Sequence, residues 1–199
     1  MGGVLIDFSF SRTLNEFYAP EYHKILNELV FENDVWRRMD AGLERSEDVI
    51  KRVVPQLPPE TRELMTQMIS DFYPHMPPIN GMADLIKRIK NAGYNVYLLS
   101  NASPRFFDRY LDVPALTMMD GYFISALYKL LKPQREIYEA FCDKFKVKAE
   151  ECFFIDDMAA NIEGAKKYGM SGFVFEKDIN ALETALKDAG VNIQRRVIL

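Results

Sequence analysis

Residues 152–170, which read CFFIDDMAANIEGAKKYGM, constrain the fold of this chain more than any other stretch. Cys152 to Ile155 form a continuous apolar run of strand length, as expected for a parallel strand buried on both faces. The run ends in two adjacent carboxylates, Asp156 and Asp157, and helical spacing follows as far as Gly169, which favours a helix end. Ligands of open α/β sheets bind beyond the carboxyl ends of the strands, so the pattern predicts carboxylates in a binding crevice.

Two interpretations of the Asp156–Asp157 pair are open. Adjacent anions repel each other, and a hard cation such as Mg²⁺ removes that cost while leaving ligand positions for water and phosphate oxygens. Alternatively, one carboxylate caps the following helix and its neighbour is solvated. Asn161, one helical turn beyond Asp157, either orients that carboxylate or is an exposed polar residue of the helix.

The second half of the chain alternates strands with helices. Buried strands are expected at 96–99, 152–155 and 172–175, with a shorter one at 122–124. This alternation predicts an α/β fold with a parallel sheet and right-handed crossovers. Residues 13–76, by contrast, have helical spacing and end among proline-rich turns, which is typical of an inserted all-helical cap.

Composition narrows the function classes. A length of 199 residues suits one core domain with a smaller insertion, and a net charge of -4 offers no field for nucleic acid or an anionic membrane. There is no apolar run of 18 residues and no secretory signal pattern, and the two cysteines are expected to be reduced thiols. We therefore predict a cytoplasmic protein, monomer or homodimer, that binds neither nucleic acid nor membrane.

Polar residues also follow two other predicted strand or loop ends: Ser100-Asn101 and Lys132. A hydroxyl and an amide can hold phosphate oxygens, an ammonium neutralises charge, and the carboxylate pair can hold Mg²⁺. Each position has an ordinary alternative: a turn at Ser100, a helix cap at Asn101, and a solvated helix start at Lys132.

Together and in this order, these residues predict a phosphoryl-transfer site. Ser100, Asn101 and Lys132 are the expected phosphate ligands, with Ser100 and Lys132 also catalytic. Asp156 and Asp157 are the expected metal ligands.

On these motifs, the sequence resembles the haloacid dehalogenase superfamily of phosphohydrolases over nearly its whole length. LLSN ending at Asn101 is similar to the family's second motif, the KP pair at Lys132 to its third, and FFIDDMAANIEGA to its fourth. Within the family, it resembles the helical-cap subgroup of small sugar-phosphate phosphatases and the phosphatase domain of epoxide hydrolases. The resemblance implies a Rossmann-like core of residues 1–12 and 77–199, a helical cap of residues 13–76, and a Mg²⁺-dependent phosphatase of a small phosphorylated metabolite.

This sequence departs from the family's pattern at the first motif. In the family, an apolar strand ends in Asp-x-Asp or Asp-x-Gly directly before Gly-Val-Leu/Ile, and the first Asp becomes an aspartyl-phosphate. Aligning GGVLID places that Asp, with its strand, just before Met1. Either the native chain extends upstream, or residues 1–7 occupy the strand position and Asp7 replaces the nucleophile. As written, the chain is expected to be inactive or impaired.

Two other functions are alternatives to the phosphatase. A metal-independent haloacid dehalogenase is disfavoured by the carboxylate pair at Asp156-Asp157, since dehalogenases of this superfamily carry a neutral residue early in the motif. A non-catalytic member that binds a phosphorylated ligand or a partner protein would explain the vacant nucleophile position.

Overall fold

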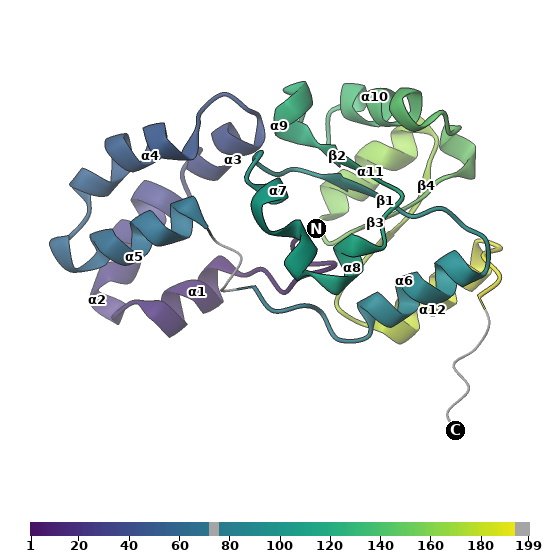
Figure 1. Ribbon diagram of the computed structural model, residues 1–199, viewed down its shortest axis with the longest axis horizontal. Coiled ribbons are helices and arrows are strands. Elements are labelled where there is room, and N and C mark those ends of the chain that lie inside the picture. The colour runs from purple at the N-terminus through teal and green to yellow at the C-terminus, as the bar shows by residue number, and fades with distance from the viewer. Residues whose placement is uncertain (72–75, 194–199) are drawn as a thin grey trace.

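The computed structural model describes residues 1–71 and 76–193, so 72–75, at the end of the predicted cap, and the tail 194–199 lie outside the description. The helices of the N-terminal part gather on one side of the molecule, away from the strands (Figure 1). They are α1 (Phe10–Phe17), α2 (Pro20–Leu26), α3 (Val35–Asp40), α4 (Ser46–Val53) and α5 (Pro59–Ser70). A π-helical turn at Asn27–Phe31 continues α2.

Local sequence explains where these helices begin. Ser9 caps α1 by accepting a hydrogen bond from the backbone N–H of Arg12, and α2 and α5 carry a proline at their first turn, where no N–H is needed. The fully buried side chains of Leu26, Val30 and Met65 belong to the apolar core that these helices share. None of the described helices is both long and apolar enough to cross a membrane.

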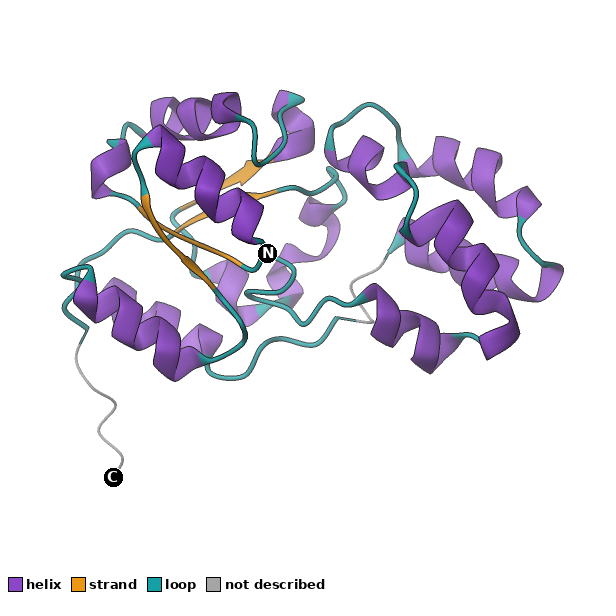
Figure 2. Ribbon diagram, turned by 180° about the vertical axis from the view of Figure 1, so that it is seen from behind, coloured by secondary structure: helices purple, strands orange, loops and turns teal. Residues whose placement is uncertain are grey.

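The α/β part follows the predicted alternation. Its strands are β1 (Tyr97–Ser100), β2 (Gly121–Ile124), β3 (Phe153–Asp156) and β4 (Ser171–Val174). Its longer helices are α6 (Met82–Asn91), α10 (Arg135–Phe145), α11 (Ala159–Tyr168) and α12 (Ile179–Asp188). Helices α6 and α12 lie side by side on one side of the strands, with α10 and α11 on the other (Figure 2). Three short helices, α7 (Phe106–Arg109), α8 (Pro114–Thr117) and α9 (Ser125–Tyr128), lie in the connections.

The described strands form two separate pairs. β1 pairs in parallel with β2, and β3 pairs in parallel with β4, so β1 and β3 each have a strand partner along one edge. A groove of about 630 Å³ lies between the two pairs, lined by Leu98 and Leu99 of β1 and by Phe153 and Ile155 of β3. The parallel α/β fold is therefore confirmed, and its sheet is interrupted between β1 and β3.

The first seven residues form tight turns. Gly2 and Ile6 make an isolated bridge, the N–H of Gly3 donates to the carbonyl of Ile6 at 2.9 Å, and Ile6 also bridges Pro78. Because the chain folds back on itself within five residues, it cannot extend as a strand beside β1 and β3. The alternative in which residues 1–7 replace a central strand is wrong.

Candidate functional site

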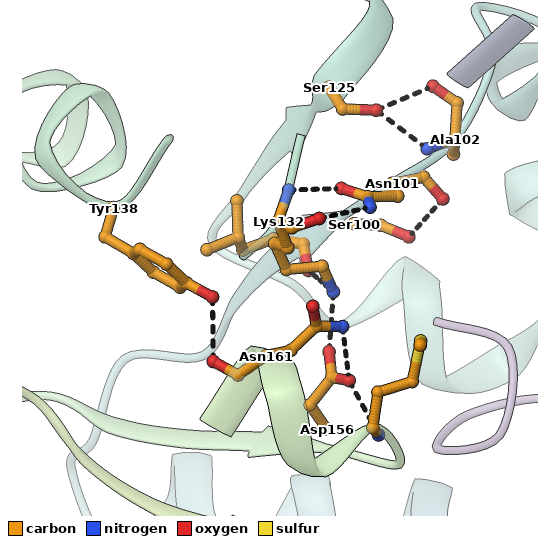
Figure 3. Close-up of polar contacts among 10 residues, drawn as sticks. Ser100, Asn101, Ala102, Ser125, Lys132, Tyr138, Asp156 and Asn161 are labelled. Atoms are coloured by element: carbon orange, nitrogen blue, oxygen red, sulfur yellow. Dashed lines mark hydrogen bonds and ion pairs between the residues drawn. The ribbon is translucent and has the colours of Figure 1, made fainter. Parts of the chain in front are cut away.

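The predicted polar residues converge at the carboxyl ends of β1 and β3 (Figure 3). Ser100 ends β1, Asp156 ends β3, and Lys132 lies in the loop between α9 and α10. The Lys132 ammonium donates to the carbonyl of Leu99 at 3.2 Å and to Oδ2 of Asp156 at 2.6 Å. One ammonium group therefore bridges the two strand pairs at their carboxyl ends.

Burial and hydrogen bonding make Lys132–Asp156 a tight ion pair. Both side chains are buried, at 4% exposure each, and Oδ1 of Asp156 accepts from Asn161 Nδ2 at 2.8 Å and from the backbone N–H of Met158 at 3.0 Å. Burial alone would raise the pKa of Asp156, but the charge and hydrogen bond of Lys132, together with Asn161, lower it. Asp156 is therefore an ionised carboxylate, and Lys132 is not a solvated helix start.

Asn101 holds the Lys132 loop in place. Its side-chain oxygen accepts from the backbone N–H of Lys132 at 2.9 Å, and its amide donates to the carbonyl of Lys132 at 3.2 Å. The helix-cap alternative for Asn101 does not occur, because α7 begins at Phe106 without a side-chain cap. Ser100 is buried beside it and donates to the carbonyl of Asn101 at 3.3 Å.

Asp157 lies against the N-terminal turn. Gly3 has a φ of +72°, and a Cβ built on it would fall 2.1 Å from Oδ2 of Asp157, so only glycine permits this approach. Partial loss of solvent, followed by the charge of Asp156, raises the pKa of Asp157. Lys132 also acts on Asp157, but its charge is the smallest of the causes there, whereas it bonds directly to Asp156.

The carboxylates of Asp156 and Asp157 fit a Mg²⁺ ion that keeps most of its water ligands. The described residues contain no cluster of three or more His, Cys, Asp and Glu side chains, which excludes a closed protein cage among them. Mg²⁺ is commonly held by one or two carboxylates together with water and substrate phosphate oxygens. Asp156 and Asp157 are such a pair, and a cation beside them would offset their repulsion.

The backbone nitrogen of Met1 lies in the same cluster. Burial, followed by the charge of Lys132, lowers the pKa of this amine to about 5, and the carboxylates of Asp156 and Asp157 oppose that shift. The start of the N-terminal turn thus reaches the centre of the predicted site.

Asp7 lies elsewhere in the molecule. Its carboxylate accepts a hydrogen bond from Lys177 at 2.5 Å and forms an ion pair with Arg12, and the Lys177 bond is the main cause of its lowered pKa. None of the described side-chain contacts of Asp7 involves Lys132, Asp156 or Asp157. The structure gives no support to Asp7 as a substitute nucleophile.

A second cavity, of about 500 Å³, opens between the helical part and the site. Its wall is mainly apolar and aromatic, formed by Phe8, Phe10, Trp36, Met39, Met68 and Phe106. The residues that follow β1, from Asn101 to Ser103, form part of its rim. Of the predicted phosphate ligands, Asn101 therefore lines this cavity.

Sequence reasoning missed Asp40, which ends α3 and lines this cavity. Burial raises the pKa of Asp40 to about 7, against the charges of Lys132 and the Met1 amine and a hydrogen bond from the N–H of Ser103. Nothing in the local sequence marked it, since its environment comes from residues about 60 and 90 positions away.

Ser125 was not predicted from the sequence either. It connects the end of α3 to the loop that follows β1. Its hydroxyl donates to the carbonyl of Asp40 at 2.5 Å and accepts from the N–H of Ala102 at 2.9 Å. Gly42, with a φ of +66°, allows this approach, because a Cβ there would lie 2.4 Å from the carbonyl oxygen of Ala126.

Comparison with known proteins gives relatives of several activities. The chain is 32% identical to a sesquiterpene phosphatase of Aspergillus oryzae over 92 residues, which is 46% of this chain and 47% of that protein. It is 24% identical to an (S)-2-haloacid dehalogenase of Burkholderia cepacia over 83% of this chain and 63% of the relative. The chain thus spans between about half and two thirds of the length of these curated relatives.

Solved structures share the fold. A haloacid dehalogenase family enzyme of Bacteroides thetaiotaomicron, crystallised with magnesium and inorganic phosphate, has a TM-score of 0.75 at 20% identity, covering 92% of this chain and 95% of that one. A HAD-like family hydrolase of Porphyromonas gingivalis has a TM-score of 0.74 at 22% identity, covering 94% of both chains.

The family profile of the haloacid dehalogenase-like hydrolases matches residues 1–169, which include the N-terminal turn, the helical part and all residues of the Lys132–Asp156 cluster. On this match, supported by the shared fold, the chain belongs to the haloacid dehalogenase-like hydrolases.

Proposed function

We propose that this protein acts as a Mg²⁺-dependent phosphatase of small phosphate monoesters. The observation that carries the proposal is the buried Lys132 ammonium between the carboxyl ends of β1 and β3, with Asp156 and Asp157 beside it. A fixed ammonium next to a carboxylate pair suits a doubly charged phosphate together with Mg²⁺. The ammonium then pairs with the phosphate, and the carboxylates pair with Mg²⁺.

Each residue of the cluster has a role in this proposal. Asp156 and Asp157 would hold Mg²⁺, which supplies charge neutralisation at the phosphoryl oxygens. Lys132 and the Ser100 hydroxyl would hold phosphate oxygens, and Asn101 keeps the Lys132 loop in position through its two backbone hydrogen bonds. Asn161 fixes the orientation of Asp156.

The attacking group is proposed to be a carboxylate on the residue attached to the nitrogen of Met1. That nitrogen lies within the charge cluster of Lys132, Asp156 and Asp157, so a residue joined to it would lie beside the proposed phosphate and Mg²⁺ ligands. An aspartate there could attack phosphorus and form an aspartyl-phosphate as the ester P–O bond breaks and the substrate's alcohol leaves with a proton from solvent; water then cleaves the aspartyl-phosphate to aspartate and inorganic phosphate.

The cavity at the site favours substrates with an apolar body. Most of its lining residues are apolar, with Asp40, Ser103 and Arg105 among the polar ones, whereas a sugar needs a hydrogen-bond partner for each hydroxyl. Relatives named as a sesquiterpene phosphatase and as a flavin mononucleotide hydrolase of Arabidopsis thaliana are consistent with such a body. We therefore favour an isoprenyl or aromatic monophosphate over a hexose phosphate.

Binding of inorganic phosphate tests the site without requiring turnover. We expect Mg²⁺ and phosphate together to raise the thermal unfolding midpoint of this chain more than either does alone, because each would neutralise the other's charge. Asp157→Asn should abolish the part of this rise in the unfolding midpoint that requires Mg²⁺. Asp7→Asn, the matched control, should retain it, because Asp7 is paired with Arg12 and Lys177.

Turnover separates the phosphatase from its alternatives. A chain extended upstream of Met1 by an apolar strand ending in aspartate should release phosphate from an isoprenyl monophosphate only with Mg²⁺, and faster than from a hexose phosphate. Halide release from a short 2-haloacid without Mg²⁺ would instead indicate a dehalogenase. Phosphate binding without turnover of any phosphoester tried would indicate a non-catalytic binding protein.

A further inference from the structure

Asp40 is a titratable group of the apolar cavity that has no role in the proposed mechanism so far. It ends α3, lines the cavity together with Asn101, and interacts with the charge of Lys132. The backbone N–H of Ser103, which also lines the cavity, donates a hydrogen bond to the carboxyl group of Asp40. A substrate with its phosphate at Lys132 and its body in the cavity would therefore have its ester oxygen on the side where Asp40 lies.

The end of α3 has a fixed position against the loop that follows β1. The Ser125 hydroxyl donates to the backbone carbonyl of Asp40 at 2.5 Å and accepts from the N–H of Ala102 at 2.9 Å. Ala102 directly follows the Ser100-Asn101 pair of the proposed site. Because one hydroxyl group joins the two segments, the backbone of Asp40 is held relative to the phosphate ligands, as a proton-transfer group requires.

The surroundings of Asp40 favour its protonated form up to about neutral pH. Loss of solvent is the main cause that raises its pKa to about 7, whereas the charges of Lys132 and of the Met1 amine and the hydrogen bond from Ser103 lower it. Asp156 is instead ionised, because Lys132 lowers its pKa against the effect of burial. Carboxyl groups whose environments separate their pKa values suit different tasks, one as a fixed charge and the other as an acid.

We propose that Asp40 is the catalytic acid for the departing alcohol and the base for the water that attacks next. This role rests on the proposed function. As the ester P–O bond breaks, the Asp40 carboxyl gives its proton to the departing oxygen, so the substrate leaves as a neutral alcohol and Asp40 becomes a carboxylate. In the second step, this carboxylate takes a proton from water as the water oxygen bonds to phosphorus. The bond between phosphorus and the acyl oxygen breaks, which releases inorganic phosphate and the nucleophilic carboxylate and leaves Asp40 protonated again.

Dependence on the leaving group distinguishes an acid from a residue that only binds substrate or packs. 4-Nitrophenolate is stable as an anion and needs no proton, whereas an isoprenyl alkoxide needs one. In the upstream-extended chain with Mg²⁺, Asp40→Asn should lower kcat/KM for an isoprenyl monophosphate by about 10²- to 10³-fold, and that for 4-nitrophenyl phosphate by less than about threefold. Because kcat/KM reports the steps up to alcohol release, the later attack by water does not enter this comparison.

Asp34→Asn is the matched control, because Asp34 is an exposed carboxylate before the other end of α3 and pairs with Arg37. It should leave both kcat/KM values within about twofold of the unsubstituted protein. An equal loss for both esters in Asp40→Asn would overturn the acid role while the phosphatase proposal stands. If the unsubstituted protein hydrolyses neither ester, the phosphatase proposal and the role of Asp40 are both wrong.

The protonation of Asp40 is also measurable in this chain without turnover. Trp36, the only tryptophan of the sequence, lies four residues before Asp40 on α3 and lines the same cavity, so the two side chains are neighbours on one helix face. We expect the fluorescence of Trp36 to change with a midpoint at about pH 7 in the unsubstituted chain and in Asp34→Asn, but not in Asp40→Asn. The same change in all three proteins would show that another group titrates, and it would overturn the acid role of Asp40.

Discussion

At the residue scale, the Lys132–Asp156 ion pair carries the greatest energetic weight in the site, because both partners are removed from water. A buried charge that loses its partner costs about 3–5 kcal/mol, since its desolvation is no longer repaid. We expect Asp156→Ala to lower the free energy of unfolding by about 3 kcal/mol. Combining it with Lys132→Met should restore part of that loss, as measured by urea denaturation. Simple additivity of the two changes would contradict the coupling.

Asp40 predicts a pH dependence of stability. Its pKa is about 7 in the folded state against an ordinary value of 3.8, so between these pH values the folded state holds a proton that the unfolded state has lost. This group therefore reduces stability as pH rises through that window, by at most about 1.4 kcal/mol per pH unit. We expect Asp40→Asn to flatten the decline, measured by urea denaturation from pH 4 to pH 8.

The Met1 amine changes stability with pH in the opposite direction, so its contribution must be distinguished from that of Asp40. Its pKa is lowered from 8.0 to about 5, so from pH 5 to pH 8 the unfolded state binds more protons and stability rises with pH. The unsubstituted protein and Asp40→Asn both carry this amine. The difference between their pH profiles therefore reports the contribution of Asp40 alone. An identical pH profile for the two proteins would refute the raised pKa of Asp40.

The sequence predicted the site residues that follow a strand, and it predicted Lys132 from the KP pair in a loop. Ser100 and Asp156 follow apolar runs, and the structure places both at the converging edge. Asp40 and Ser125 had no such signal, because tertiary contacts alone create their surroundings. The bidentate role of Asn101 toward the Lys132 backbone was likewise invisible, since it joins segments about 30 residues apart.

At the element scale, the connection between α3 and α4 depends on Gly42. A side chain there would combine left-handed strain with a contact of 2.4 Å to the carbonyl of Ala126. We expect Gly42→Ala to cost at least about 2 kcal/mol of unfolding free energy, from strain and the lost approach together. Gly93→Ala is the matched control, because Gly93 has a φ of +90° and no atom within 4 Å of a built Cβ. Its cost should be about 1 kcal/mol, and equal losses at both sites would rule out the contact at Gly42.

Strand positions were predicted to within one residue, because each strand is a continuous apolar run with no helical competitor. The short helices α8 and α9 were not predicted, since four residues are too few to show a period. Strand pairing could not be assigned either. The pairing of β1 with β2, and of β3 with β4, depends on how the intervening helices pack, which the local sequence does not specify.

At the scale of the whole molecule, Arg105 joins the helical part to the α/β part. Its guanidinium donates to Ser46 Oγ at 2.5 Å and to Glu47 Oε1 at 2.7 Å, at the start of α4. The side chain is 36% exposed, so we expect Arg105→Ala to change the unfolding free energy by less than about 1 kcal/mol. Amide exchange in α4 should nevertheless quicken several-fold, because one of its contacts across the cavity is lost.

Arg45→Ala is the control for that change. Arg45 pairs with Asp48 within the same helical part, and the pair does not reach the α/β core. Its removal should leave exchange in α4 almost unchanged. If both substitutions quicken exchange equally, the effect comes from local helix stability and not from the contact with the core.

The division of the strands into two pairs has a consequence for cooperativity. In a continuous sheet, the loss of any strand exposes its neighbours, and the domain unfolds in one step. Here β1–β2 and β3–β4 have no backbone ladder between them in the described structure, and the Lys132 side chain is one of the few polar links across the groove. We expect the calorimetric enthalpy of unfolding to exceed the van 't Hoff enthalpy, with the β3–β4 half and its helix melting as a unit of its own.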